Sequence, residues 1–362
     1  DLFPQRQRPT GYFHSQDAEW DSNGQALWIM RRLCALSGLP PKPAWWGPIR
    51  RAARWIGRKR LPPGESGHAG LLPAGFSAEH LGPNDYYYWD DFWAVAGLRA
   101  AAEMAAQLGH SNEARAFSEE AEDLSGAINR SLARAAGRLG RLAMPASPHR
   151  RLDAGSIGSL AAGYPLPLMP PDDPRLIDTA AFLRERCFFG GGFFQEMTHS
   201  GINPYLTLHV AQVLMRAGDP ASGELLAAVA GLASPTGQWP EAIHPRTLGG
   251  CMGDGQHVWA AAEWVLMLRN AFLREEGDAL LLGQGLAAEW LRPGRTLSFG
   301  PAPTSFGAVS LRVEAGRDAV ALSWTARWHG APPRIEIRLP GAAPVLAGPD
   351  AARVVVGRGL VP

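Results

Sequence analysis

Two hydrophobic periods divide this chain of 362 residues. From Trp20 to about Arg274, apolar residues recur at i, i+3, i+4 and i+7, which is the spacing of one face of an α-helix. From Thr296 onward apolar and polar residues alternate, which indicates short strands separated by Gly/Pro turns. The order of the two periods predicts a mainly α protein, with a helical domain over residues 1–275, a linker over 276–295 and a small antiparallel β-domain over 296–362.

The helical part alternates between two kinds of helix. One kind begins with aromatic, Asp, Asn or His residues just after a Gly/Pro-rich loop, whereas the other is Ala-rich and carries Glu and Arg on one face, as an outward-facing helix does. This alternation predicts a double ring of helical hairpins. The inner helices are expected near 21–37, 87–108, 154–163, 203–217 and 255–275, and the outer ones near 44–59, 111–135, 174–187 and 220–233.

The composition excludes several classes of protein. Hydrophobic residues make up 46% and charged residues 19%, which rules out disorder, and a net charge of +1 gives no reason to expect a nucleic-acid partner. No apolar run approaches the roughly 18 residues of a membrane-spanning helix. The three widely spaced cysteines argue against a disulfide scaffold or a zinc site. We therefore expect a soluble protein without metal, cofactor or obligate protein partner, with the cytoplasm favoured among the compartments left open.

Acidic and aromatic residues gather before the first inner helix. Glu19, Trp20 and Asp21 lie within a short segment that holds further acids and a second Trp. A helix cap by Asp21 or Ser22 is one interpretation, but a cap requires only one such residue. Aromatic faces beside hydrogen-bonding carboxylates are the groups that hold a sugar ring, so we expect a carbohydrate site here.

A second acidic and aromatic segment, residues 82–93, opens the next inner helix. It contains Asp85, Trp89, Asp90 and Asp91. Acids at a helix start interact favourably with the helix dipole, which is the structural interpretation. Neighbouring carboxylates buried among aromatic rings can instead raise one pKa and so divide the roles of acid and base.

A third segment, residues 237–259, is a long Gly-rich loop that leads into the last inner helix. It carries Trp239, Glu241, His244, His257 and Trp259. Polar groups concentrated on a loop of a rigid scaffold are typical of binding and catalysis. No HExxH or similar metal-ligand motif occurs in the chain.

The order of these segments resembles glycoside hydrolase family 15, the glucoamylase, glucodextranase and bacterial trehalase group of the six-hairpin glycosidases. The similar stretches are Asp21-x-x-Gly24-x-x-Leu27, Trp89-Asp90-Asp91 with Ala96-Gly97, Asp153-Ala154, Asp173-Pro174-Arg175, Asn203-Pro204-Tyr205 and Pro240-Glu241 with His244-Pro245. The resemblance spans about residues 8–272. Asp stands here at both acidic positions after Trp89, where the family has Glu.

The resemblance implies an (α/α)6 barrel. Five inner helices leave this ring one hairpin short of six, so the first pair is expected upstream or absent. It further implies an inverting glycosidase acting on an α-linked glucoside or related oligosaccharide, with Asp90 (alternatively Asp91 or Asp85) as general acid and Glu241 as general base. The candidate substrate-binding residues are Glu19, Trp20, Asp21, Asp85, Trp89, Asp91, Asn203, Trp239, His244, His257 and Trp259.

Two other functions remain open on the sequence alone. A polysaccharide lyase on a helical toroid would need a Tyr or His base, with residues 86–88, His199 and His209 as candidates. A non-catalytic carbohydrate-binding relative would account for the shortened acids and the missing hairpin.

Overall fold

The computed structural model describes residues 2–76, 82–197 and 200–358. Its helical part runs from the N-terminus to residue 272, and strands dominate from residue 273 onward. The helices are α1 (Leu2–Arg6), α2 (Ser22–Ser37), η1 (Pro43–Trp45), α3 (Trp46–Lys59), α4 (Tyr88–Gln107), α5 (Ser111–Leu139), η2 (Ala154–Ala162), α6 (Pro174–Arg186), α7 (Pro204–Ala217), α8 (Ala221–Gly231), α9 (Val258–Phe272) and η3 (Ala288–Leu291).

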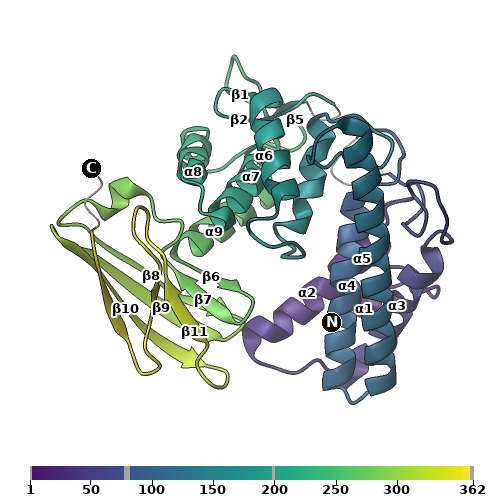
Figure 1. Cartoon of the computed structure of the whole chain (residues 1–362), viewed down its shortest axis with the longest axis horizontal. Helices are drawn as coiled ribbons and strands as arrows, with labels where there is room; N and C mark the ends of the chain where they lie inside the picture. The colour runs from purple at the N-terminus through teal and green to yellow at the C-terminus, as the bar shows by residue number, and fades with distance from the viewer. Residues whose placement is uncertain (1, 77–81, 198–199, 359–362) are drawn as a thin grey trace.

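The predicted alternation of inner and outer helices is present. Along the inner series α2 packs on α4, α4 on η2, η2 on α7 and α7 on α9, while α3, α5, α6 and α8 cover the outside (Figure 1). The inner element η2 is a 3₁₀ helix where an α-helix was expected. Strand β8 packs against both α2 and α9, the two ends of the inner series. Closure of the ring as an (α/α)6 barrel stays a prediction.

Two glycines let α2 and α4 approach closely. A Cβ atom on Gly24 would lie 2.2 Å from the carbonyl oxygen of Trp93, and one on Gly97 would lie 2.6 Å from the Cα of Gly24. No side chain fits between the two backbones at this crossing. The close approach brings Asp21, just before α2, against Trp89 in the first turn of α4.

A small five-stranded sheet interrupts the helical part and was not predicted. Its strands follow the order β1-β2-β3-β4-β5. They are too short for period-two alternation to register in the sequence. The strands are β1 (Phe188–Phe189), β2 (Gly192–Gln195), β3 (Gly201–Ile202), β4 (Ala242–Ile243) and β5 (Gly250–Met252).

The C-terminal region folds into two four-stranded sheets with their own hydrophobic core. The sheets have the orders β13-β10-β9-β8 and β12-β11-β7-β6. Strand β7 and the last residue of β6 lie in the segment 276–295 that was expected to be a linker; the Leu-rich β7 is buried throughout, so it shows no alternation. The strands are β6 (Leu273–Glu276), β7 (Ala279–Leu282), β8 (Thr296–Thr304), β9 (Gly307–Ala315), β10 (Ala319–Trp328), β11 (Arg334–Ile337), β12 (Val345–Leu346) and β13 (Arg353–Gly357).

A row of charges on β6 ties the β-sheets to the helices. The carboxylate of Glu275 lies 2.6 Å from the guanidinium of Arg269 on α9 and 3.3 Å from that of Arg32 on α2, and it accepts the backbone N–H of Ser305. The next residue, Glu276, pairs with Arg216 on α7 at 2.7 Å. Because the partners lie on three inner helices, these pairs fix the β-domain to the base of the helical part.

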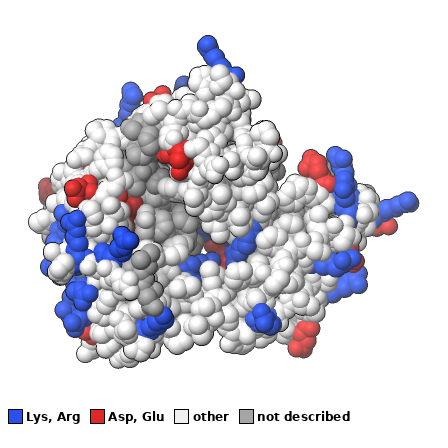
Figure 2. All heavy atoms as spheres, turned by 180° about the vertical axis from the view of Figure 1, so that it is seen from behind, with Lys and Arg blue, Asp and Glu red and all other residues white. Residues whose placement is uncertain are grey.

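The charged surface is mixed. Lys and Arg side chains lie toward both the left and the right margins in Figure 2, with Asp and Glu among them. On α3, Arg51, Arg54 and Arg58 are exposed, so the basic run between residues 50 and 60 covers a solvated outer face. In the part of the chain that the structure describes, no helix has the length and apolar character needed to span a membrane.

Candidate active site

Four carboxylates lie buried where the inner helices α2 and α4 begin. Glu19, Asp21, Asp90 and Asp91 are each at most 2% exposed. Three of the four also have a buried carboxylate oxygen with no hydrogen-bond partner among the described residues, namely Glu19, Asp90 and Asp91. A buried ionised carboxylate without a partner is costly, so this cluster is not explained by packing of the protein alone.

Asp21 precedes α2 but does not cap it through its side chain. Its Oδ2 instead accepts hydrogen bonds from Trp89 Nε1 and from Gln25 Nε2, both at 2.8 Å. Burial raises the pKa of Asp21 to about 6, although the bond from Trp89 favours the ionised form. The carboxylate therefore links the first turns of two inner helices, and the capping interpretation does not apply.

Asp90 lies in the first turn of α4, and neither of its carboxylate oxygens has a partner in the described structure. Burial, followed by repulsion from Asp21, Asp91 and Glu19, raises the pKa of Asp90 well above its ordinary value. The helix dipole at this position favours the anion, but it is too weak to offset burial among three other acids. Asp90 therefore keeps its proton to a higher pH than an exposed aspartate does.

Asp91 has a more structural environment than Asp90. Its Oδ1 accepts the backbone N–H of Leu72 at 2.8 Å and so holds the loop that follows α3. Burial raises the pKa of Asp91 to about 8, against the lowering effects of that hydrogen bond and of Arg60. Of the two adjacent acids, Asp90 has two oxygens without a described partner, whereas Asp91 has one, Oδ2.

Glu19, Trp20 and Asp85 each have a partner within the protein. Glu19 accepts a hydrogen bond from Ser15 Oγ through Oε2, which leaves its Oε1 without a described partner. The ring of Trp20 lies beneath the ammonium of Lys59 on α3 at 3.7 Å, and its indole N–H donates to the backbone of Ala74. Asp85 accepts from Ser147 Oγ and so joins two loops.

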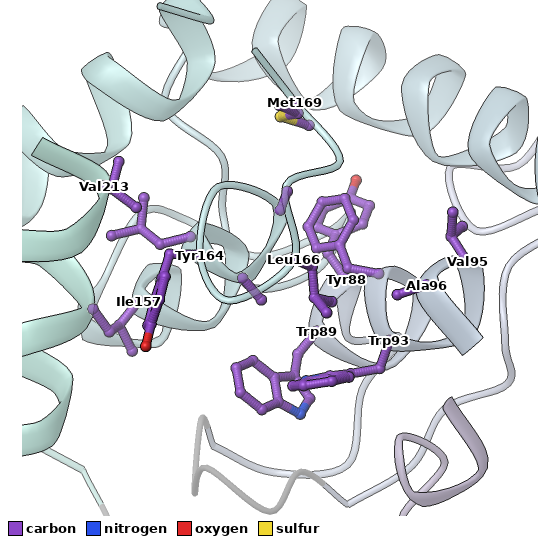
Figure 3. Close-up of a cluster of buried hydrophobic side chains, with 14 of the residues drawn as sticks. Tyr88, Trp89, Trp93, Val95, Ala96, Ile157, Tyr164, Leu166, Met169 and Val213 are labelled. Carbon is purple, nitrogen blue, oxygen red and sulfur yellow. The ribbon is translucent and has the colours of Figure 1, made fainter. Parts of the chain in front are cut away.

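A series of aromatic rings leads from the acids to α7 and α9. Trp89 lies 6.4 Å from Trp259 between ring centroids, and Trp259 lies 4.8 Å from Tyr205, which lies 4.8 Å from His257. Trp89 also packs on Trp93, and Figure 3 shows these two indoles side by side beneath Leu166. The first turns of α4, α7 and α9 thus lie at one end of the helical part.

Glu241 lies beside His257 at the same end. Its Oε2 is 4.0 Å from His257 Nδ1, which in turn lies 2.8 Å from Asp254 Oδ1. The side chain of Glu241 is only 12% exposed. Glu241, Asp254 and His257 each offer one ligand atom within 4.8 Å of the other two, which is close enough to hold a metal ion. The side chain of Asp254 is largely exposed.

Three predicted residues make contacts within the protein. Trp239 is buried, donates its indole N–H to the backbone of Val229 and packs on Trp264. His244 accepts two backbone N–H groups of the turn that follows it. Asn203 precedes α7 and donates to the backbone of Gly201. These contacts hold the loops at the helix starts.

A further buried acid, Glu263, was not identified from the sequence. Glu263 of α9 accepts from Tyr164 at 2.8 Å, and it lies 3.1 Å from His209 Nε2 of α7 and 3.3 Å from the indole nitrogen of Trp259. The signal was weak, since Glu263 lies mid-helix one turn after Trp259. This network connects the turn after η2 with α7 and α9 and holds the indole of Trp259.

The residues considered for a lyase are placed differently from the acids. His209 is engaged with Glu263, and Tyr88 hydrogen-bonds to Ser131 of the outer helix α5. Tyr87 donates to the backbone of Pro83. His199 lies outside the described residues. Tyr87, Tyr88 and His209 therefore have hydrogen-bond partners inside the protein, and the ring of Tyr86 stacks on His68.

Comparisons with known proteins give structural neighbours only. No protein-family model matches the chain, and no curated protein matches it. A structure described as a wild-type glycosidase is 19% identical, with a TM-score of 0.51, over 69% of this chain and 66% of that one. An α-L-rhamnosidase from Dictyoglumus thermophilum is 11% identical, with a TM-score of 0.54, over 92% of this chain and 37% of that one. A GH78 rhamnosidase from Bacillus sp. GL1 is 15% identical, with a TM-score of 0.50, over 87% of this chain and 32% of that one.

This chain spans two-thirds or less of each of these neighbours. At such identities the similarity shows the fold alone, and that fold is one found in glycosidases. The neighbours do not single out family 15.

Proposed function

We propose that this protein is an inverting glycoside hydrolase that cleaves an α-linked glucoside or related oligosaccharide. The observation that carries the proposal is the orphaned carboxyl group of Asp90, buried beside Asp21 and Asp91 in a helical fold shared with glycosidases. The hydroxyl groups of a sugar would supply the hydrogen bonds that the buried acids lack.

In this mechanism Asp90 is the general acid. A carboxyl group whose pKa is raised by burial keeps its proton to a higher pH, and it can donate that proton to the glycosidic oxygen as the bond to the anomeric carbon breaks. The shorter Asp side chain lies directly in the first turn of α4, so the substrate must approach that helix end closely.

Glu241 is the general base. Water attacks the anomeric carbon from the face opposite the leaving oxygen, and the Glu241 carboxylate takes its proton. Inversion requires a separation of roughly 6.5–9.5 Å between the two carboxyl groups, so that this water fits between them. The aromatic series from Trp89 through Trp259 to Tyr205 joins the starts of α4, α9 and α7 and offers ring faces for a sugar.

The remaining acids bind the substrate in this proposal. The free Oε1 of Glu19 and Oδ2 of Asp91 would accept sugar hydroxyls, and Asp21 would hold Trp89 in place. Trp20, Asp85, Asn203, Trp239, His244 and His257 would shape the loops around the sugar.

The test compares two variants on two kinds of substrate. Glu241→Gln should lower kcat by about 10²–10⁴ on every substrate while sugar binding by calorimetry persists. Asp90→Asn should lower kcat similarly on a natural disaccharide but much less on a nitrophenyl glycoside, because that leaving group needs no proton. Product followed by NMR should show the inverted anomer. Full turnover in both variants would contradict the roles; sugar binding without turnover in the wild type would indicate the non-catalytic relative.

An α-L-rhamnoside is a second candidate substrate. The two rhamnosidase structures match 87% and 92% of this chain, which extends beyond the helical part into the C-terminal sheets, whereas the glycosidase match covers 69%. This likeness rests on fold alone. Nitrophenyl α-L-rhamnoside assayed beside maltose, isomaltose, trehalose and kojibiose discriminates between the two substrate classes.

A further inference from the structure

Gly253 lies directly against the side chain of Glu241. A Cβ atom on Gly253 would be 1.8 Å from Oε2, 2.5 Å from Cδ and 2.6 Å from Cβ of Glu241. Real Cβ atoms do not approach other atoms below about 3.0 Å. Because the contact includes the Cβ of Glu241, rotating the carboxylate end alone would not relieve it; the whole side chain would have to move.

This contact follows from the register of β4 and β5. Ala242 pairs with Met252 in this antiparallel ladder, so the positions just outside it, Glu241 and Gly253, face each other. The N–H of Glu241 donates to the carbonyl of Asp254 at 2.9 Å, which continues the pairing by one step. The backbone of Gly253 has a φ of +67°, a left-handed conformation that glycine adopts without strain.

We propose that Gly253 is a positioning residue for Glu241: it provides the space in which the Glu241 carboxylate lies and thereby fixes the direction in which that carboxylate faces. His257 lies 4.0 Å from the same Oε2 and is held by Asp254, so the loop encloses the carboxylate from a second side. The catalytic consequence rests on the proposed function, whereas the contact itself does not.

The chain offers a matched control in Gly237. This glycine lies in the same loop region and has a φ of +77°, but a Cβ atom there would meet nothing within 4 Å. Alanine at either position incurs the strain of a left-handed conformation, roughly 1 kcal/mol. Only alanine at Gly253 would also displace Glu241.

The experiment compares Gly253→Ala with Gly237→Ala. We expect kcat to fall at least 100-fold in Gly253→Ala with KM within threefold of wild type, and both constants to stay within threefold in Gly237→Ala. Crystal structures of both variants should show the Glu241 side chain moved only in Gly253→Ala. Equal losses in the two variants, or an unmoved Glu241 in Gly253→Ala, would overturn the proposal.

A stability cycle covers the case in which Gly253→Ala does not fold. Glu241→Gly removes all three clashing atoms, so the double variant with Gly253→Ala should fold. Relative to Glu241→Gly alone, the double variant should lose no more stability than Gly237→Ala loses relative to the wild type. If the double variant also fails to fold, the contact is not what makes Gly253 necessary. If the wild type cleaves no glycoside, the proposed function fails, while the structures and the cycle still decide whether Gly253 positions Glu241.

Discussion

The acids at the start of α4 show burial overcoming the helix dipole at single residues. Asp90 and Asp91 lie where a helix end favours anions, yet burial raises the pKa of both. A carboxyl group whose pKa is higher in the folded chain than in the unfolded chain binds more protons when folded. Its contribution to stability is therefore full at low pH and is lost as pH rises through its folded pKa.

For this reason we expect the protein to lose stability between about pH 4 and pH 8. Asp21, with a pKa of about 6, contributes a loss of roughly 3 kcal/mol over the lower half of that range. Asp91, with a pKa of about 8, extends the loss of stability to the upper half.

Asp91→Asn keeps an acceptor for the Leu72 N–H and carries no charge, so the stability of this variant relative to wild type should rise from pH 5 to pH 8.5. Urea unfolding at both values checks this change. Asp278→Asn, at a largely exposed side chain, should show no such trend, and parallel curves for wild type and Asp91→Asn would contradict the explanation.

At the scale of elements, the close crossing of α2 and α4 determines where the acids meet. Gly24 and Gly97 allow two backbones to touch, and Asp21 reaches Trp89 only because the helices are this close. The network at Glu263 acts similarly between the turn after η2, α7 and α9. Contacts between inner helices thus set the geometry of the helix starts.

Gly24→Ala should therefore destabilise the fold by about 3 kcal/mol or more, since the added methyl would lie 2.2 Å from a backbone oxygen. The separation of α2 from α4 should also break the bond between Asp21 and Trp89 and change the tryptophan fluorescence. Gly137→Ala on α5 is the control: a methyl there meets nothing within 4 Å, so we expect a gain of up to about 1 kcal/mol. If Gly24→Ala and Gly137→Ala unfold at similar temperatures, the crossing of α2 and α4 accommodates an added methyl group and this explanation is wrong.

At the scale of the whole molecule, the helical part and the C-terminal sheets have separate cores joined at one interface. Trp290 packs against both cores, and Glu275 joins β6 to α2 and α9. Although burial opposes it, the pKa of Glu275 is lowered to about 2 by Arg269 and then by Arg32. A lowered pKa gives a contribution that is present above about pH 4.5 and is lost as pH falls toward 2.

Glu275→Gln should accordingly cost about 3 kcal/mol of unfolding free energy at pH 7 and much less at pH 3. Calorimetric scans at the two pH values measure the difference, and the variant should also unfold in a less cooperative transition because the two parts are less tightly coupled. Glu289→Gln, at an exposed position on η3, should change stability by under about 0.5 kcal/mol at either pH. An equal effect of Glu275→Gln at pH 3 and pH 7 would contradict the ion-pair account.

The sequence by itself determined the order of inner and outer helices, the change to strands near the C-terminus and the three acidic and aromatic segments at helix starts. These features are local, since helical periodicity and the residues that follow a Gly/Pro loop can be seen within a short window. The small sheet of β1–β5 and the buried Glu263 could not be found in this way. Strands of two to four residues are too short to show a period, and a single Glu within a helix differs from a surface Glu only by what surrounds it.

Only the tertiary structure decided what the acids do. A helix cap was one interpretation of Asp21 until its partner was seen to be Trp89 of another helix. The raised pKa of Asp90 depends on acids as far away in the chain as Glu19, and the contact of Gly253 with Glu241 depends on strand register. Ionisation and side-chain position are set by burial and by neighbours brought together through folding, and neither can be read from the residues next to them in sequence.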